Sequence, residues 1–150
     1  MDKQTMTIVF LINGEEVCLA EKKRRFRKGK INGSGGKLEP GESALECAVR
    51  ETREEFEVDL KEVREHGKVV YIGDSYHYTC HVFVATEWEG EPVETEEMAP
   101  DWYHLDNLPL HRMGSTDHLW LPHVLRGAKV KAHFEWDSEK NLVKEEYALE

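Results

Sequence analysis

Three acidic residues in the middle of the chain have the spacing of a metal-binding helix face. Glu51, Glu54 and Glu55 lie in a stretch that reads GKLEPGESALECAVRETREEFEV at residues 36–58. On an α-helix these positions are i, i+3 and i+4, so their side chains project within an arc of about 100°. Like charges this close repel each other unless a cation lies among the oxygens. Mg²⁺ or Mn²⁺ suits that role, because hard divalent cations take oxygen ligands and leave positions for water and substrate phosphates. The alternative is a solvated acidic face, which is the usual meaning of a charge run on a helix.

The stretch around these carboxylates resembles the Nudix box, the signature of hydrolases that act on nucleoside diphosphates linked to another group. The matching positions are Gly36, Glu42, Arg50, Glu51, Glu54, Glu55 and Val58. With them in register, we favour the metal site over the solvated face. The chain departs at Thr52, where the family usually has an aliphatic residue, and at Glu57, where it usually has glycine. Glycine past the end of a helix commonly adopts a left-handed conformation that a side chain disfavours, so Glu57 leaves the geometry of the helix end open.

The helix that must position the carboxylates has its own start signal. Ser43 followed three residues later by Glu46 is a capping box, which satisfies backbone N–H groups at a helix start, so we expect the helix to begin at Ser43. A separate arc of about 100° has the width of a face packed on a core. Its residues are Leu45, Ala48, Val49, Thr52 and Phe56. We expect one face of the helix to pack and another to coordinate.

Length, charge and cysteine usage restrict the class of protein. At 150 residues the chain suits one domain over residues 1–150. A net charge of −10 disfavours stable binding to nucleic acid or an anionic membrane. Cys18, Cys47 and Cys80 are scattered without metal-ligand spacing and are read as reduced, mostly buried thiols. The chain has no apolar run of transmembrane length and no signal-peptide layout at its start, and we expect a cytoplasmic protein. We also expect a monomer.

The remaining pattern predicts strands and a second helix. Residues 5–12 and 17–24 form a hairpin through Asn13-Gly14, the strongest short hairpin signal. Further strands are expected at 68–72, 76–87, 102–105, 130–136 and 142–149, with a second helix at 117–126 closed by Gly127. These elements give an α/β sandwich with a central mixed sheet between helices, which is also the Nudix fold that the resemblance implies.

Outside the box, the resemblance is to one group within the family. Segments 21–26, 31–37, 92–109 and 120–122 resemble the MutT-type purine nucleoside triphosphatases, whose animal members clear oxidised dGTP and dATP. It implies a nucleoside pocket in which Asn32 and Asp117 read the base edge. The full implied set is Thr7, Lys22, Asn32, Tyr71, Met98 and Asp117. Alternatives remain for four of them: Thr7 and Tyr71 as ordinary strand residues, Met98 as core and Asn32 as a turn residue.

Two positions depart from the animal relatives within that pocket. Gly114 and Thr116 stand where those relatives carry a tryptophan that stacks on the base and a neighbouring aspartate. The loss of a stacking ring removes on the order of 1 kcal/mol of binding free energy for the base. The range of substrates is therefore the least secure part of the resemblance. Trp120 could turn inward to compensate, but a core tryptophan is the favoured interpretation.

A basic run precedes the glycine loop. Residues 22–30, KKRRFRKGK, hold seven of the 20 lysines and arginines. We favour a rim that attracts the substrate phosphates, with a solvated edge and a nucleic-acid-binding segment as the alternatives.

The resemblance also implies the chemistry. Metal ligands would be Glu51, Glu54, Glu55, Glu97 and the Gly36 carbonyl, with Arg50 orienting the carboxylates and Glu51 or Glu97 as general base. The resemblance also implies that Glu55 is one of the catalytic residues. The expected reaction converts a purine nucleoside triphosphate to monophosphate and pyrophosphate, with Mg²⁺ or Mn²⁺ as cofactor. The alternatives are a Nudix hydrolase of other substrates, such as ADP-ribose or dinucleoside polyphosphates, and a nucleotide-binding module without catalysis. The intact acidic triplet argues against the module.

Overall fold

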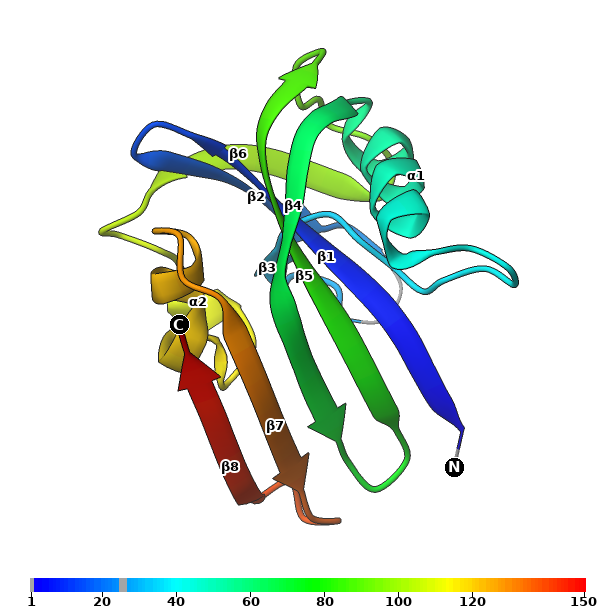
Figure 1. The fold of residues 1–150 in the computed structure, drawn as a ribbon, viewed down its shortest axis with the longest axis vertical. Helices are drawn as coiled ribbons and strands as arrows, with labels where there is room; N and C mark the ends of the chain where they lie inside the picture. Colours follow the sequence, from blue (N-terminus) through cyan, green and yellow to red (C-terminus); the bar gives the residue numbers. More distant parts are fainter. Residues whose placement is uncertain (1, 25–26) are drawn as a thin grey trace.

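The computed structural model describes residues 2–24 and 27–150, and its strands join in one mixed sheet (Figure 1). The elements in chain order are β1 (Lys3–Asn13), β2 (Glu16–Lys22), β3 (Ile31–Asn32), α1 (Ala44–Phe56), β4 (Asp59–Ile72), β5 (His77–Glu89), β6 (Met98–His104), the 3₁₀-helix η1 (Leu110–Arg112), α2 (Asp117–Val124), β7 (Val130–Trp136) and β8 (Leu142–Leu149). The strand order is β3-β2-β1-β5-β4-β7-β8, and β6 pairs with β2. The β1–β5 and β4–β7 pairs are parallel and the others are antiparallel.

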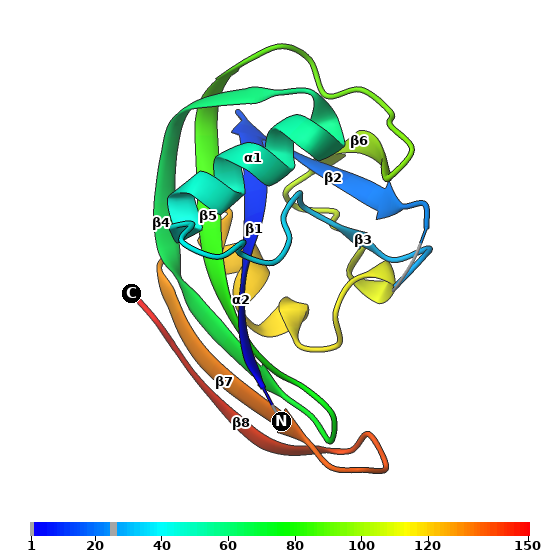
Figure 2. The same ribbon diagram turned by 90° about the vertical axis from the view of Figure 1, so that its right-hand side faces the viewer.

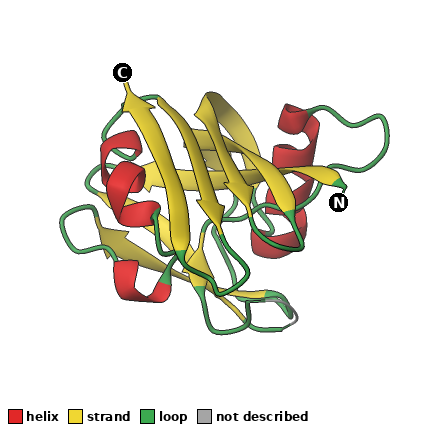
Figure 3. Cartoon of the chain, turned by 90° about the horizontal axis from the view of Figure 1, so that it is seen from below, coloured by secondary structure: helices red, strands yellow, loops and turns green. Residues whose placement is uncertain are grey.

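The two helices cover opposite faces of the sheet (Figure 2 and Figure 3). Side chains alternate along a strand, and β1 shows the result. Val9 packs in the core beneath α1 with Phe56, whereas Phe10 packs on the other face with Leu121 of α2. The predicted α/β sandwich with a mixed sheet is therefore confirmed.

Local signals placed several elements correctly. The β1–β2 hairpin turns at Gly14, which has a φ of 62°, and β7 pairs antiparallel with β8 as expected. The three cysteines are free and buried. The second helix begins at Asp117 as predicted but ends at Val124, two residues early. No helix in residues 2–24 and 27–150 is long and apolar enough to cross a membrane.

Several strands extend beyond their predicted ends: β1 spans Lys3–Asn13 rather than residues 5–12, β5 ends at Glu89 rather than at residue 87, and β4 and β6 begin earlier. β4 begins at Asp59 rather than at residue 68, because pairing with β5 extends the strand through a charged, largely exposed first half. β6 begins at Met98 and contains Pro100, which was expected to precede the strand. The proline is tolerated there because β6 pairs only with β2, so one edge needs no N–H donor from it.

Helix α1 has the predicted start and a left-handed end. Ser43 is its N-cap, and the reciprocal bonds of the capping box with Glu46 are both present. Glu57 takes the left-handed conformation itself, with φ 58° and ψ 39°, and its N–H donates to the Arg53 carbonyl. The helix end therefore keeps its geometry despite the missing glycine. The predicted packing face was wrong at Leu45, which is 48% exposed, whereas Cys47 is fully buried.

Candidate active site

The acidic face of α1 is organised around one guanidinium. Arg50 donates from Nε to Glu42 Oε2 at 2.7 Å and from Nη1 to Glu51 Oε1 at 2.8 Å. Its Nη1 also lies 3.5 Å from Glu54 Oε2. The hydrogen bonds from Arg50 lower the pKa of Glu42 to about 2, and the pKa of Arg50 itself is raised by the same partners. Arg50 thus supplies the positive charge that the acidic helix face requires.

Glu51 and Glu55 are carboxylates in partly or largely buried positions. Glu55 is 9% exposed, and its Oε1 accepts a hydrogen bond from the Gly35 N–H at 2.8 Å. Burial raises the pKa of Glu55 to about 8 and also raises the pKa of Glu51. A carboxylate whose ionised form is disfavoured by burial gains strongly from a nearby cation. Glu54 differs, because its side chain is 58% exposed.

The glycine loop lies directly against these carboxylates. A Cβ on Gly36 would stand 2.6 Å from Glu51 Cδ, so only glycine allows this approach. The Gly36 carbonyl accepts the Thr7 N–H at 2.9 Å, which places it on the edge of β1. Behind the loop, the hydroxyls of Ser34 and Thr52 lie 2.8 Å apart and are both fully buried. That bond gives the unusual Thr52 a structural role, since an aliphatic residue could not make it.

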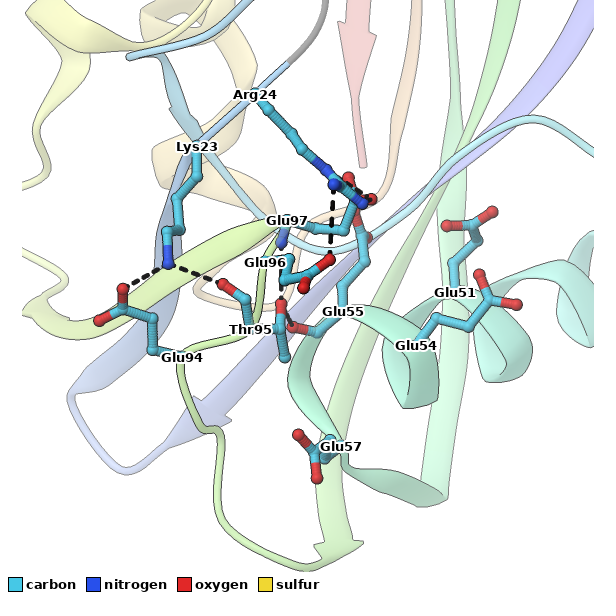
Figure 4. Close-up of a pocket in the computed structure, with 10 residues that line it drawn as sticks. All are labelled: Lys23, Arg24, Glu51, Glu54, Glu55, Glu57, Glu94, Thr95, Glu96 and Glu97. Atoms are coloured by element: carbon cyan, nitrogen blue, oxygen red, sulfur yellow. Dashed lines mark hydrogen bonds and ion pairs between the residues drawn. The ribbon is translucent and has the colours of Figure 1, made fainter.

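A second acidic segment forms the opposite wall of the pocket. Residues 94–97, with Lys23 and Arg24 just after β2, face α1 across an open cavity of about 970 Å³ (Figure 4). The segment is tied to the end of the helix, because the Thr95 hydroxyl donates to the Glu55 carbonyl at 2.9 Å and the Val93 N–H donates to the Phe56 carbonyl at 3.2 Å. Glu97 consequently lines the same pocket as the acidic triplet.

These carboxylates line the pocket without converging on one point. Among residues 2–24 and 27–150, no three acidic, histidine or cysteine side chains stand close enough to hold a metal ion as they are. Glu51 and Glu54 instead share Arg50, and Glu97 pairs with Arg24. The donor chemistry nevertheless fits a hard divalent cation, because the carboxylate oxygens face one cavity and the Gly36 backbone lies against Glu51.

The basic run meets the acidic wall. Lys23 Nζ lies 2.5 Å from Glu94 Oε2 and donates to the Thr95 carbonyl at 2.8 Å. Arg24 pairs with Glu97 and lies 3.5 Å from Glu96. The two cations of the run that line the pocket are thus engaged by carboxylates, and Arg25 and Phe26 lie outside the described residues.

Two residues of the predicted nucleoside pocket lie together on the α2 face. Tyr71 packs against the core beneath α2, and Asp117 is only 5% exposed. The Asp117 Oδ2 accepts the Gly114 N–H at 2.9 Å, and burial raises the pKa of Asp117 to about 6. Burial and the nearby Asp117 also raise the pKa of Tyr71. Trp120, as expected, is a core residue.

The other four predicted residues are more spread out. Met98 is buried opposite Lys22 in the β2–β6 pair. The Asn32 Oδ1 accepts the N–H of the next residue at 3.0 Å. Thr7 is turned toward α1, where its hydroxyl lies 3.3 Å from Cys47 Sγ. Sequence reasoning named these residues but missed Thr95 and Cys47, because their partners come from distant segments.

This arrangement, a glycine loop packed on an acid-bearing helix at the edge of a mixed sheet, defines a hydrolase of the Nudix class. The chain belongs to that family, since the NUDIX domain matches residues 2–124. Nudix hydrolases generally use divalent metal ions.

The chain is also similar to individual proteins of known name or structure. The chain is 34% identical over 140 residues to the oxidized purine nucleoside triphosphate hydrolase of Danio rerio, covering 92% of this chain and 90% of that protein. The protein of the same name from Mus musculus is 32% identical over 139 residues, covering 91% and 89%. Among solved structures, the mutator MutT protein from Bacillus halodurans superposes with a TM-score of 0.82 at 28% identity, covering 98% and 97%.

Proposed function

We propose that this chain hydrolyses an oxidised purine nucleoside triphosphate, such as 8-oxo-dGTP, to the monophosphate and pyrophosphate with Mg²⁺. The observation that carries the proposal is the acid-lined pocket at the Nudix helix, in a chain similar to oxidized purine nucleoside triphosphate hydrolases over about 90% of both lengths. Three glutamates from α1 and three from the 94–97 segment line that pocket. The same reaction removes damaged nucleotides from the precursor pool.

The chain's own residues have distinct tasks in this reaction. Glu51, Glu54, Glu55 and Glu97 would hold the divalent ion with the Gly36 carbonyl. When bound, the ion neutralises phosphate oxygens and acidifies water. Arg50 keeps Glu51 oriented through their 2.8 Å bond. Glu51 and Glu97 are the two candidates to accept the proton of the attacking water, since both line the cavity where the phosphates must lie.

Recognition of the base is assigned to the α2 face of the sheet. Asp117 and Trp120 are i and i+3 on α2, so they share one side of the helix. Within the described residues the buried Trp120 Nε1–H has no hydrogen-bond partner. A purine edge beside Asp117 would offer a hydrogen-bond partner to the Asp117 carboxyl and to the Trp120 Nε1–H. The raised pKa of Asp117 lets its carboxyl serve as donor or acceptor near pH 6. Asn32 is proposed as the second base-reading residue.

A substrate panel in Mg²⁺ tests this proposal. We expect the highest kcat/KM for oxidised purine triphosphates among 8-oxo-dGTP, dGTP, 2-hydroxy-dATP, dCTP, ADP-ribose and diadenosine tetraphosphate. Asp117→Ala should lower kcat/KM for 8-oxo-dGTP far more than for dCTP, because an unpaired polar group discriminates strongly between base edges. Thr116→Asp should broaden the range toward 2-hydroxy-dATP. The exposed Asp106→Ala is the control. An equal loss on all substrates in Asp117→Ala would make that residue structural.

We further propose that residues 1–150 act as one Nudix domain and that the chain works as a monomer. The single sheet shared by β1 to β8 supports the one-domain proposal. We propose in addition that the chain has no stable nucleic-acid or membrane partner, which its net charge of −10 supports.

A further inference from the structure

A second pocket lies away from the carboxylates, on the sheet face that also carries α2. Its volume is about 390 Å³, and it is lined by Asp2, Gln4, Lys37, Ser75, Tyr76 and Tyr78. Paired strand residues share a face, and the register runs from Gln4 to Tyr78 to Tyr71 across β1, β5 and β4. Because Tyr71 packs beneath α2, the pocket belongs to that face. None of its lining residues lines the acidic pocket.

Two tyrosines give this pocket an aromatic surface. The rings of Tyr76 and Tyr78 are stacked, with centroids 5.2 Å apart and planes inclined by 15°. Tyr76 is held by the β4–β5 turn, in which the Gly73 N–H donates to the Tyr76 carbonyl at 2.9 Å. A Cβ on Gly73 would stand 2.3 Å from the Tyr76 ring, so the ring lies directly on the glycine backbone. The aromatic surface is therefore formed before any ligand arrives.

The polar groups around the rings favour a particular ligand chemistry. Across the described residues Gln4 Oε1 is buried without a hydrogen-bond partner, and a ligand N–H would satisfy it. Lys37 Nζ lies over the Tyr78 ring, 5.8 Å from its centroid, which places a positive charge at this aromatic surface. A flat ring that stacks, an N–H donor and an attached anion are combined in a purine nucleotide.

The pocket adjoins the acidic site through one backbone segment. The carbonyl of Lys37 accepts a hydrogen bond from Arg50 Nη2 at 3.2 Å, whereas its side chain lies over Tyr78. Gly36, the preceding residue, lies against Glu51. Lys37 thus links the two regions, because its carbonyl contacts the Arg50 guanidinium while its side chain reaches Tyr78 of the second pocket.

We propose that this pocket binds a second purine ring that carries phosphate, independently of the nucleoside pocket at Asp117. Two sources share that chemistry: the far nucleoside of a dinucleoside polyphosphate whose phosphates lie at the carboxylates, and a free purine mononucleotide.

Titration of the full chain with AMP in EDTA tests the site without hydrolysis. Backbone amide NMR signals of residues 73–78 and Lys37 should shift and saturate, and ribose 5-phosphate should bind at least about tenfold more weakly because it cannot stack. Tyr78→Leu should weaken AMP about tenfold. The exposed Tyr147→Leu on β8 should match the parent chain.

Two further variants separate binding from folding. Gly73→Ala leaves every polar group of the pocket in place but displaces the Tyr76 ring, so it should weaken AMP severalfold. Gln4→Met keeps the side-chain volume and removes the unpaired acceptor, so it should raise thermal stability while weakening AMP. Saturable shifts confined to the surroundings of Asp117, or unchanged AMP affinity in Tyr78→Leu and Gln4→Met, would overturn the second site.

Turnover in Mg²⁺ then distinguishes the two sources. If the pocket holds the far half of a dinucleotide, Tyr78→Leu should raise KM for diadenosine tetraphosphate severalfold and leave kcat/KM for 8-oxo-dGTP unchanged. If it takes a free nucleotide, both substrates should be unaffected while the AMP titration still loses affinity. Failure of the parent chain to hydrolyse 8-oxo-dGTP would refute the proposed function alone, because the AMP titration needs no turnover.

Discussion

Glu57 is the position where this chain departs most clearly from its family, and replacing it by glycine should stabilise the fold. Glu57 has φ 58° and ψ 39°, the left-handed helical conformation. That conformation costs a residue with a Cβ about 1–2 kcal/mol. Glycine removes this strain but loses about 0.5–1 kcal/mol of additional chain freedom on folding. The expected net gain for Glu57→Gly is therefore about 0.5–1 kcal/mol, or roughly 2 °C in Tm for a chain of this length.

Charge must be separated from conformation in this experiment. Glu57 lines the acidic pocket with other carboxylates, so removing it also relieves repulsion. Glu57→Ala removes the same charge and keeps the Cβ, and it is the matched control. Urea unfolding in EDTA, followed by tryptophan fluorescence, gives the free energy of unfolding for the parent and both variants. Glu57→Gly should exceed Glu57→Ala by about 0.5–1 kcal/mol. Equal stability of the two variants would refute the strain argument and assign the effect to charge.

Two further predictions concern the pocket. Replacing Glu54 or Glu55 by Gln should reduce kcat at least about a hundredfold. Glu55→Gln should leave the metal-free fold intact or slightly more stable, because a buried carboxylate is lost. The exposed Glu62→Gln is the control, and near-normal turnover in Glu55→Gln would contradict the metal assignment. If the basic run steers the triphosphate, kcat/KM should fall with added salt and fall further when Arg24 and Arg27 become Gln, with kcat little changed. A salt dependence identical to that of the parent would make the run a solvated edge.

The sequence predicted those parts of the fold that depend on neighbouring residues. The capping box of α1 and the Asn13-Gly14 hairpin are local, because each bond closes within a few residues. The first half of β4 was missed because its charged residues face solvent, and only its pairing with β5 makes it a strand. Strand lengths set by pairing with distant partners are not encoded in a single segment.

The same distinction applies to the site. The spacing of the α1 carboxylates follows from helix geometry, whereas the engagement of Arg24 by Glu97 joins residues 73 positions apart. The packing face of α1 was predicted correctly at Ala48, Thr52 and Phe56, which are all fully buried. It failed at Leu45 because the first turn of the helix presents Cys47 to β1, where its sulfur meets Thr7.

Arg50 resolves the electrostatic problem that the acidic triplet poses. A divalent ion is not the only cation that can stand among these oxygens, because the guanidinium contacts Glu51 and Glu54 from the same helix. Its strongest partner is Glu42, which it meets through both Nε at 2.7 Å and Nη2 at 2.9 Å. Anchored at Glu42, Arg50 would remain in place if Glu51 and Glu54 were to hold a divalent ion. Arg50 thus neutralises part of the acidic face of α1 in the structure, and Glu42 is the partner that holds it there.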